Sequence, residues 1–385
     1  MILKLARKSL WNRRGTAILT LVSLAISVAL ILGINHLRHQ AKQSFTSTIS
    51  GTDLIVGARS GQANLLLYSV FRIGNATNNI TWESYEAIKK SRDIEWTIPL
   101  SLGDSHRGFR VLGTDHNYFD HYRYGDRRAL AFSAGGPFSR IYDTVLGAQV
   151  ARELGYTIGQ EIVIAHGLGD VSFSMHDDKP FTVVGILEPT GTPVDRTVHV
   201  RLEGIEAIHL GWQHGARMPG RGVSAEEALL RELEPEAITA FLVGLKSRMA
   251  TFRLQRAINE YRKEALTAIL PGVALAELWD VLGMVENMLI VVAFLVLLAT
   301  LVGMTTTLLS SMKERQRELA ILRAVGAHAG YLFALIEIEA LLLAAAGVAF
   351  GILLLSLSLF MLQPWLAAEY GLFISANPLN SEALL

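Results

Sequence analysis

The stretch SSMKERQRELAILRAVGAHAG, residues 310–330, decides how this chain is organised. A dense cluster of charges runs into the apolar string Leu319, Ala320, Ile321 and Leu322, and the small residues of 324–327 follow. Long apolar runs lie on both sides of it. The role of this short, charged, helix-forming segment depends on what the apolar runs on either side of it form.

Three runs are long enough to cross a membrane. The chain of 385 residues is 51% hydrophobic and only 18% charged, whereas ordinary soluble domains carry about a quarter charged residues. The runs are residues 15–35, 287–312 and 331–363, and the last becomes wholly uncharged after Glu339. About 20 helical residues cross a hydrocarbon core of roughly 30 Å. We therefore predict three transmembrane helices rather than the buried helices of a large soluble core.

The placement of Lys and Arg predicts the orientation of these spans. Residues 1–14 carry basic side chains and no acid, the loop 313–330 carries four basic residues, and the tail 364–385 carries none. We predict that 1–14 is a cytoplasmic amphipathic helix and that the loop 313–330 is also cytoplasmic. Residues 36–283 and the tail then lie outside. The first run is too long for a signal peptide and is read as an anchor.

The region 36–283 is predicted to be a large mixed α/β domain between spans 1 and 2. Helix-like patterns occur at 81–91, 144–154 and 249–266, and strand-like patterns at 95–102, 109–113, 161–165 and 237–245. The strand-like runs 181–187 and 197–202 are joined by a turn-rich segment and are predicted to pair. The Gly- and Arg-rich stretch 211–227 is the best candidate for a mobile loop.

Several function classes have no support in the sequence. The net charge is zero, which gives no case for nucleic-acid binding. The chain has no cysteine, so disulfides, thiolate metal sites and cysteine nucleophiles are excluded. It contains no G-x-x-x-x-G-K-[ST] pattern and so cannot hold nucleotide phosphates as a P-loop does. We predict a chain without catalytic residues or a cofactor of its own.

The histidines leave a metal site open. His166, His176, Asp177 and Asp178 flank one predicted hairpin and could face each other, and His116, Asp120 and His121 cluster elsewhere. Neutral imidazoles with a carboxylate suit zinc. The alternative is that these are ordinary polar residues of loops and surface, which is the commoner case, and the sequence prediction is no metal.

The charged loop and the third span each carry a packing signal. The helix in the loop has two apolar faces, Leu319-Leu322-Gly326 and Ile321-Ala324-Val325, so one can face the membrane helices and the other a cytoplasmic partner. Gly326 is a helix stop. Gly347 and Gly351 form a G-x-x-x-G motif, which we interpret as packing within the chain rather than a dimer seam. The alternative for the loop is an interfacial helix that only braces the membrane domain.

Residues 314–327, ERQRELAILRAVGA, resemble the E-R-x-R-E-[IL]-[AG]-[IL]-x-R-A-[IV]-G-A signature of permeases with an FtsX-like C-terminal domain. These are the membrane subunits of MacB-type ABC transporters, a group that includes LolC, LolE and FtsX. The N-terminal ARKSLWNRRGTAILTLVSLAISVALIL is similar to that family's start. The resemblance implies a MacB-like periplasmic core domain at 36–283 and a multi-pass protein of the bacterial inner membrane.

The resemblance also implies partners and a site. Residues 314–327 match the coupling helix that sits in a groove of a cytoplasmic ATPase, of which two copies bind ATP and Mg. A second copy of this chain or a paralogous permease completes the transporter in the lipid bilayer, and a periplasmic protein is a further candidate partner. The implied ATPase-coupling residues are Glu314, Arg315, Arg317, Glu318, Leu319, Leu322, Arg323, Ala324, Gly326 and Ala327.

The implied mechanism is mechanotransmission, in which ATP-driven motion is carried through helices to the periplasmic domain. Two alternatives stay open: an FtsX-like regulator that activates a periplasmic enzyme, and a metal-handling system built on the histidines. Family members have four spans, the last beginning soon after a motif like that of residues 375–379. We therefore expect the tail 364–385 to precede a fourth span and this sequence to be a shortened chain.

The predicted topology can be tested by labelling single cysteines introduced into this cysteine-free chain. A Cys placed within 211–227 should react with a membrane-impermeant reagent applied from outside. A Cys within 313–330 should react only after the cytoplasmic side is opened. Cytoplasmic reactivity of the first position would contradict the predicted orientation.

Overall fold

The structure is a computed structural model, and it describes residues 6–8, 10–11, 13–166, 178–210, 212–213, 216–217, 223–231, 233–314 and 316–370. The described residues form two compact units. We call them the helical unit, within 1–42 and 281–369, and the sheet unit, within 43–280. Part of the stretch 211–227, predicted as a mobile loop, lies outside the described residues, and so do residues 371–385 of the tail.

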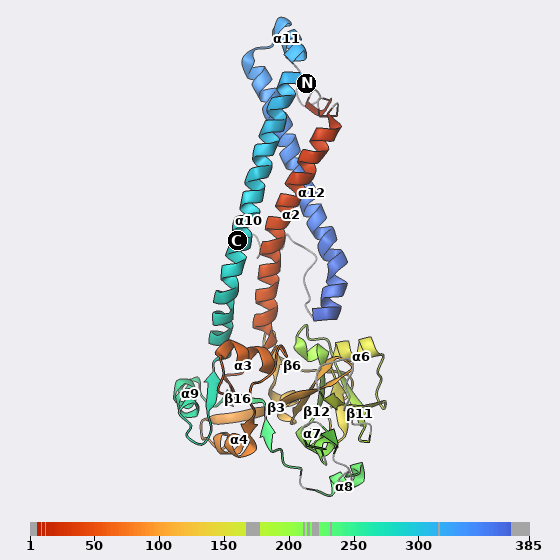
Figure 1. The fold of residues 1–385 in the computed structure, drawn as a ribbon, viewed down its shortest axis with the longest axis vertical. Coiled ribbons are helices and arrows are strands. Elements are labelled where there is room, and N and C mark those ends of the chain that lie inside the picture. The colour runs from red at the N-terminus through yellow and green to blue at the C-terminus, as the bar shows by residue number, and fades with distance from the viewer. Residues whose placement is uncertain are drawn as a thin grey trace. The chain divides into compact units, whose positions relative to one another are not determined.

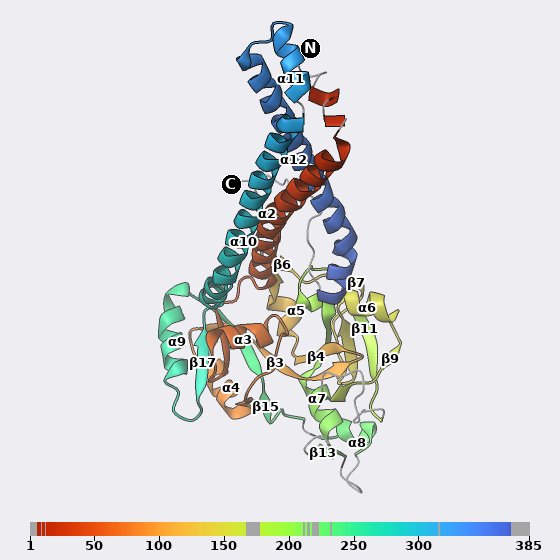
Figure 2. The same cartoon turned by 45° about the horizontal axis from the view of Figure 1, so that its top comes forward.

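Long helices make up the helical unit, as Figures 1 and 2 show. They are α2 (Arg14–Thr48), α10 (Pro271–Glu314), the short α11 (Gln316–Ala324) and α12 (Ala329–Tyr370). Within the described residues, three helical segments have the length and apolar composition needed to cross a membrane: Arg14–Gln40, Pro271–Ser310 and Ala329–Gln363. An α-helix satisfies its backbone hydrogen bonds internally, which is what an apolar segment needs in lipid.

The sheet unit is built on one mixed sheet of 11 strands. The main order is β17-β1-β16-β3-β4-β12-β8-β11-β7, with β10 paired to β3 and β9 to β11. The strands are β1 (Leu54–Ala58), β3 (Ile94–His106), β4 (Phe109–Thr114), β7 (Phe132–Gly135), β8 (Asp143–Leu146), β9 (Glu161–Ile162), β10 (Ala165–His166), β11 (Phe181–Leu187), β12 (Thr197–Arg201), β16 (Ala240–Leu245) and β17 (Leu266–Ile269).

Shorter elements connect and cover this sheet. The helices are α3 (Gln62–Ser69), α4 (Trp82–Lys89), α5 (Asn117–His121), α6 (Ala148–Leu154), α7 (Leu202–His209), α8 (Ala225–Leu229) and α9 (Thr251–Asn259), with 3₁₀ turns η1 (Pro193–Arg196) and η2 (Arg248–Ala250). Three two-stranded ladders pair β2 (Ile80–Thr81) with β15 (Ala237–Ile238), β5 (Arg123–Tyr124) with β6 (Arg128–Ala129), and β13 (Trp212–Gln213) with β14 (Ala216–Arg217).

The sheet is buried on both faces at its β1 side. Successive side chains of a strand point to opposite faces. Leu54 and Val56 join a core cluster with α4 and α9 residues, whereas Ile55 joins a cluster with Leu65 of α3. Helices therefore cover both faces, which explains why β1 reads as a continuous apolar run rather than an alternating one.

The longest strand, β3, serves both halves of the sheet. Its residues from Ile94 to Leu100 pair with β16, and those from Ser101 to His106 pair with β4. The register with β4 shifts between Leu102 and Ser105. A shift of this kind bends a strand and increases its local twist, so the strand can turn from one half of the sheet into the other.

The strands at the entry and exit of the sheet unit are neighbours. β1 follows α2 in the chain, β17 precedes α10, and the two pair antiparallel with Ile55 opposite Ile269. The first turns of α10 pack into the same unit, because Ala274 is fully buried and Leu275 contacts the core. The last residue of α2 is also held, since the Tyr122 hydroxyl donates to the Thr48 carbonyl at 2.6 Å.

The predicted fold class is confirmed, but three local predictions are wrong. Residues 144–154 are not one helix: the strand β8 ends at Leu146 and α6 begins at Ala148. The predicted pairing of 181–187 with 197–202 is also wrong, because β8 lies between β11 and β12, parallel to the first and antiparallel to the second. A short apolar run does not distinguish a buried strand from a buried helix by its periodicity.

The third wrong prediction is a helix over 249–266. The helix α9 ends at Asn259, whose side-chain oxygen accepts a 2.7 Å hydrogen bond from the Ala268 amide. Residues 266–269 then form β17 at the sheet edge. Leu266 has the helical spacing of the buried residues Leu254 and Ile258, so the sequence pattern predicts a helix that continues past the true end at Asn259. Pairing with β1 makes residues 266–269 a strand instead.

Gly147 provides a test of how tightly this unit is packed. A Cβ at this position would lie 2.3 Å from the Val194 carbonyl oxygen and 2.4 Å from that of Asp195. Gly147→Ala should therefore destabilise the protein by about 1–3 kcal/mol, since backbone must move to admit a methyl group. The denaturation midpoint of the full chain in detergent measures this. Gly136→Ala is the control, because nothing lies within 4 Å of its added Cβ, and equal midpoints for both variants would contradict the packing.

Candidate functional site

Helices α2 and α12 of the helical unit approach each other at two glycines. A Cβ on Gly347 would lie 2.6 Å from Leu24 Cδ2, and one on Gly351 would lie 2.8 Å from the Ala25 carbonyl oxygen. Leu24 and Ala25 are buried accordingly. The absence of side chains on these glycines lets the two backbones come close. These contacts confirm that the G-x-x-x-G glycines pack within the chain, and the exclusion of a dimer seam stays a prediction.

Polar contacts join α2 to α10. The hydroxyls of Ser27 and Thr300 lie 3.0 Å apart, within hydrogen-bonding distance. Further along, Arg38 Nε lies 2.9 Å from Glu286 Oε2. Polar side chains inside a membrane segment are stable when they meet a partner on another helix. Both contacts link residues about 250 to 270 positions apart in the chain, so they fix α2 against α10.

The charged loop forms the helix α11 between α10 and α12. Ile321 of α11 is 64% exposed, and Val325, which follows the end of α11 and donates its amide to the Ile321 carbonyl, is 83% exposed. Gly326 has φ of +105°, a conformation that residues with a Cβ rarely adopt. The predicted helix stop at Gly326 is confirmed by this geometry, and the apolar face Ile321-Ala324-Val325 is exposed in the single chain.

The structure places only part of the predicted coupling residues. Arg317, Arg323, Ala324 and Gly326 are exposed, and Ala327 is half-buried. The side chains of Glu314, Arg315, Glu318, Leu319 and Leu322 lie outside the described part of the chain. The ion pairs expected between Glu314 and Arg317, and between Arg315 and Glu318, therefore stay predictions.

The candidate metal ligands are likewise described only in part. The side chain of His166, and His176 and Asp177 as a whole, lie outside the described residues. Asp178 is described, with its carboxylate 4.0 Å from Lys179 Nζ. In the described part of the sequence, no three His, Asp or Glu side chains are grouped so as to hold a metal ion. The metal hypothesis for these four residues is not tested by this arrangement.

Three other histidines of the sheet unit, His116, His121 and His199, pack against aromatic rings. His121 stacks on Trp96 with ring centroids 5.2 Å apart, and His116 meets the edge of Phe138 at 5.4 Å. His199 lies fully buried beside Tyr118, and burial lowers its pKa to about 3, so it is neutral at physiological pH. His116 and His121 thus serve the packing of α5 and do not converge on one point.

Two family models match this chain. Residues 17–260 match the MacB-like periplasmic core domain, and residues 290–380 match the FtsX-like permease C-terminal domain. The chain belongs to the MacB/FtsX family of ABC permeases. Membership implies a cytoplasmic ATPase as partner, and it makes the sheet unit the extracytoplasmic domain of a membrane-spanning permease.

Two solved structures are similar to parts of this permease. One is the periplasmic region of MacB from Actinobacillus actinomycetemcomitans, with 11% identity, a TM-score of 0.37, and coverage of 60% of this chain and 94% of that one. The other is the extracellular domain of the noncanonic ABC-type transporter YknZ from Gram-positive bacteria, with 13% identity, a TM-score of 0.33, and coverage of 57% and 99%. No curated protein matches the permease in sequence.

One buried acid of the permease was missed by the sequence analysis, which took Glu339 only as the start of an uncharged run. Glu339 is 2% exposed and lies on α12, inside the apolar segment Ala329–Gln363. It lines a small cavity of about 20 Å³ together with Arg13, Thr20 and Thr307. An acid inside an apolar helix is costly unless it faces other polar groups. The position of Glu339 within an apolar run was therefore the sequence signal for a buried polar contact.

The contact between α2 and α12 can be tested with Gly351→Leu. The larger side chain would push against the Ala25 carbonyl and Val28, which should lower the stability of the permease in detergent by more than about 1 kcal/mol. Gly303→Leu on α10 is the matched control, since nothing lies within 4 Å of its added Cβ. Thermal unfolding in detergent and size-exclusion chromatography report the outcome. Unchanged stability with loss of dimer would instead place Gly351 in a dimer seam.

Proposed function

We propose that this permease is the non-catalytic membrane subunit of a MacB-type ABC system in the bacterial inner membrane. It acts as a dimer, with a second copy or a paralogous permease, and with two cytoplasmic ATPase subunits that bind ATP and Mg. Its work is to convert ATP-driven motion into a conformational change of the periplasmic domain. The exposed apolar face of α11 is the observation that carries this proposal.

That face supports a docking role for α11. Ile321 on the short helix α11 and Val325 directly after it are exposed between two membrane-crossing helices, and charged residues such as Arg317 and Arg323 are exposed beside them. Burying one such side chain gains about 1.5–3 kcal/mol. A loop of this length cannot fold a core of its own to hide them, which supports docking on a partner protein. The resemblance of residues 314–327 to the coupling helix of these permeases supports the ATPase as that partner.

The length of the helices supports transmission from α11 to the periplasm. α2 has 35 residues and α10 has 44, which correspond to about 52 Å and 66 Å at 1.5 Å per residue. Both exceed the roughly 30 Å of a hydrocarbon core, so both continue beyond the bilayer. A motion of α11 moves α10 directly, because only residue 315 separates them, and it reaches α2 through the Ser27 to Thr300 and Arg38 to Glu286 contacts.

The docking role predicts the effect of charge on the apolar face of α11. The double variant Ile321→Asp, Val325→Asp places two carboxylates in a desolvated interface, which should cost about 3 kcal/mol or more and weaken ATPase binding more than about 100-fold. Leu322→Asp should act in the same direction, and Arg323→Ala less strongly. Pull-down of the cognate ATPase and its ATP hydrolysis rate in detergent measure the effect.

The matched control is Met249→Asp, because Met249 is 90% exposed in the sheet unit. It adds a charge at an exposed apolar position that the ATPase does not reach, so ATPase binding should be unchanged. Membrane insertion of every variant should be normal, since none lies in a span. Wild-type ATPase binding by the double variant would mean that α11 only braces the membrane domain.

A further inference from the structure

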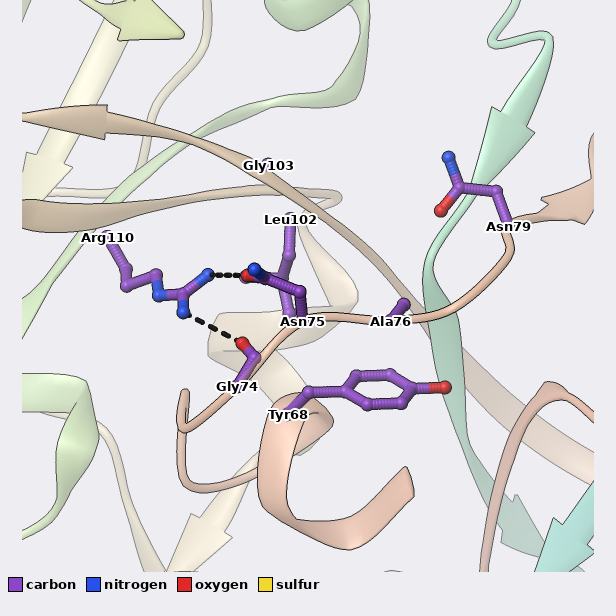
Figure 3. Close-up of a pocket in the computed structure, with 8 residues that line it drawn as sticks. All are labelled: Tyr68, Gly74, Asn75, Ala76, Asn79, Leu102, Gly103 and Arg110. Atoms are coloured by element: carbon purple, nitrogen blue, oxygen red, sulfur yellow. Dashed lines mark hydrogen bonds between the residues drawn. The ribbon is translucent and has the colours of Figure 1, made fainter. Parts of the chain in front are cut away.

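A cavity of about 320 Å³ opens on the sheet unit between the loop that follows α3 and the paired strands β3 and β4, and Figure 3 shows its lining. Tyr68 of α3, the loop residues Asn75 and Asn79, and Arg110 of β4 contribute to its walls. Small-molecule sites in proteins have volumes of about 300–1,000 Å³. The coupling mechanism makes no use of this cavity.

Arg110 is held in place by two neutral acceptors. One guanidinium nitrogen donates to Asn75 Oδ1 at 3.0 Å, and the other terminal nitrogen donates to the Gly74 carbonyl at 2.7 Å. Figure 3 shows the guanidinium on one side of the cavity beside Asn75, with Asn79 on the other side. These bonds fix the orientation of the guanidinium without neutralising its charge.

The surroundings of Arg110 are electropositive. Burial, and next to it the positive charge of Arg72, lower the pKa of the half-buried Arg110. Across the described residues, neither arginine forms an ion pair with a carboxylate. A guanidinium that is partly desolvated, fixed and not neutralised attracts an oxyanion, since hydrogen bonds between ionised partners are about twice as strong as neutral ones.

The walls of the cavity have an unusual backbone. Gly74, which lines the cavity, has φ of +78°. Arg72 lies two residues before it in the same loop, outside the lining, with φ of +60° and a side chain that donates to the Ser69 carbonyl. On the facing wall, the register of β3 shifts between Leu102 and Ser105. Left-handed residues other than glycine and strand bulges both occur preferentially near functional sites. The shape of the cavity is therefore specified by its own backbone and not left over between elements.

We propose that this cavity binds a small molecule carrying an oxyanion, either a carboxylate or a phosphate. Arg110 is the charged contact, and the amides of Asn75 and Asn79 supply further hydrogen bonds. Leu102 and Ala76 give the cavity an apolar wall, so the remainder of the ligand is compact and uncharged. This ligand site lies in the extracytoplasmic domain and is independent of ATPase docking.

The experiment is calorimetric titration of the full-length chain in detergent with three probes. They are N-acetyl-dialanine with a free carboxylate, the same dipeptide with a C-terminal amide, and inorganic phosphate. At least one oxyanion probe should bind with a Kd of about 1 mM or tighter, and the amide should not. Binding of the acid without phosphate identifies a carboxylate ligand, and binding of phosphate without the acid identifies a phosphate ligand.

Two variants locate the binding at Arg110. Arg110→Gln removes the charge and should weaken oxyanion binding at least about tenfold. Asn75→Asp keeps the shape of the side chain but sets a carboxylate 3.0 Å from the guanidinium, where it takes the place of the ligand. It should abolish oxyanion binding while leaving the thermal midpoint unchanged or raised, because Asn75 is exposed and gains an ion pair.

Asn78→Asp is the matched control, since Asn78 is an exposed neighbour that does not line the cavity. It adds the same charge and should bind the oxyanion as wild type. Equal binding of the acid and the amide, wild-type binding by both Asn75→Asp and Arg110→Gln, or no binding of either oxyanion at about 10 mM would overturn the proposal.

Discussion

Hydrocarbon accepts neither an unpaired backbone group nor an unpaired charge, and the rest of this permease follows from that constraint. It requires the three apolar segments to be unbroken helices, because only a helix satisfies its own backbone within lipid. It also favours charges at the helix ends, as at Arg14 and Lys313, and Glu339 within α12 is buried instead. The chain can return from α10 to α12 only through a short polar segment, which is why α11 and its charges are found there.

The interior of the sheet unit and the interior of the helical unit are stabilised by different interactions. In the sheet unit, side chains such as Leu54, Val56 and Phe241 leave water on folding, and their burial supplies the gain. In the helical unit the surrounding lipid is as apolar as a leucine side chain, so burial alone gains little. The helices of this unit are stabilised instead by close backbone packing at Gly347 and Gly351 and by the hydrogen bond between Ser27 and Thr300. The small and polar residues in the spans thus have a packing role.

The sequence was most informative where one physical rule dominates. Uncharged length predicted the membrane helices, and the left-handed stop at Gly326 and the packing of Gly347 and Gly351 followed from the absence of a Cβ. It failed where tertiary pairing decides. Residues 144–146 are in a strand rather than the predicted helix because β11 and β12 flank them, and Leu266, the last residue of the predicted helix 249–266, belongs to β17 at the sheet edge beside β1.

The cavity at Arg110 and the buried acid Glu339 also differ in how far the sequence could predict them. Arg110 and Asn75 lie 35 positions apart in the chain and meet only because the loop after α3 folds over β4. No local pattern marks such a pair, so the cavity could not be predicted. Glu339 was visible in the sequence but ambiguous, since an acid near the end of an apolar run reads equally well as its boundary. Only its 2% exposure shows that it lies inside.

The pairing of β1 with β17 gives a physical reason for the proposed coupling through α2 and α10 together. Four residue pairs from Ile55 to Ala58 join the strand that follows α2 to the strand that precedes α10. Sliding one helix against the other would have to break on the order of four hydrogen bonds, at about 0.5–1.5 kcal/mol each, or about 2–6 kcal/mol in all. A displacement that moves both helices together leaves that ladder intact. The easier motion therefore carries β1, β17 and the strands beyond them as one body, and β3, which pairs with β16 and β4 in turn, extends it across both halves of the sheet.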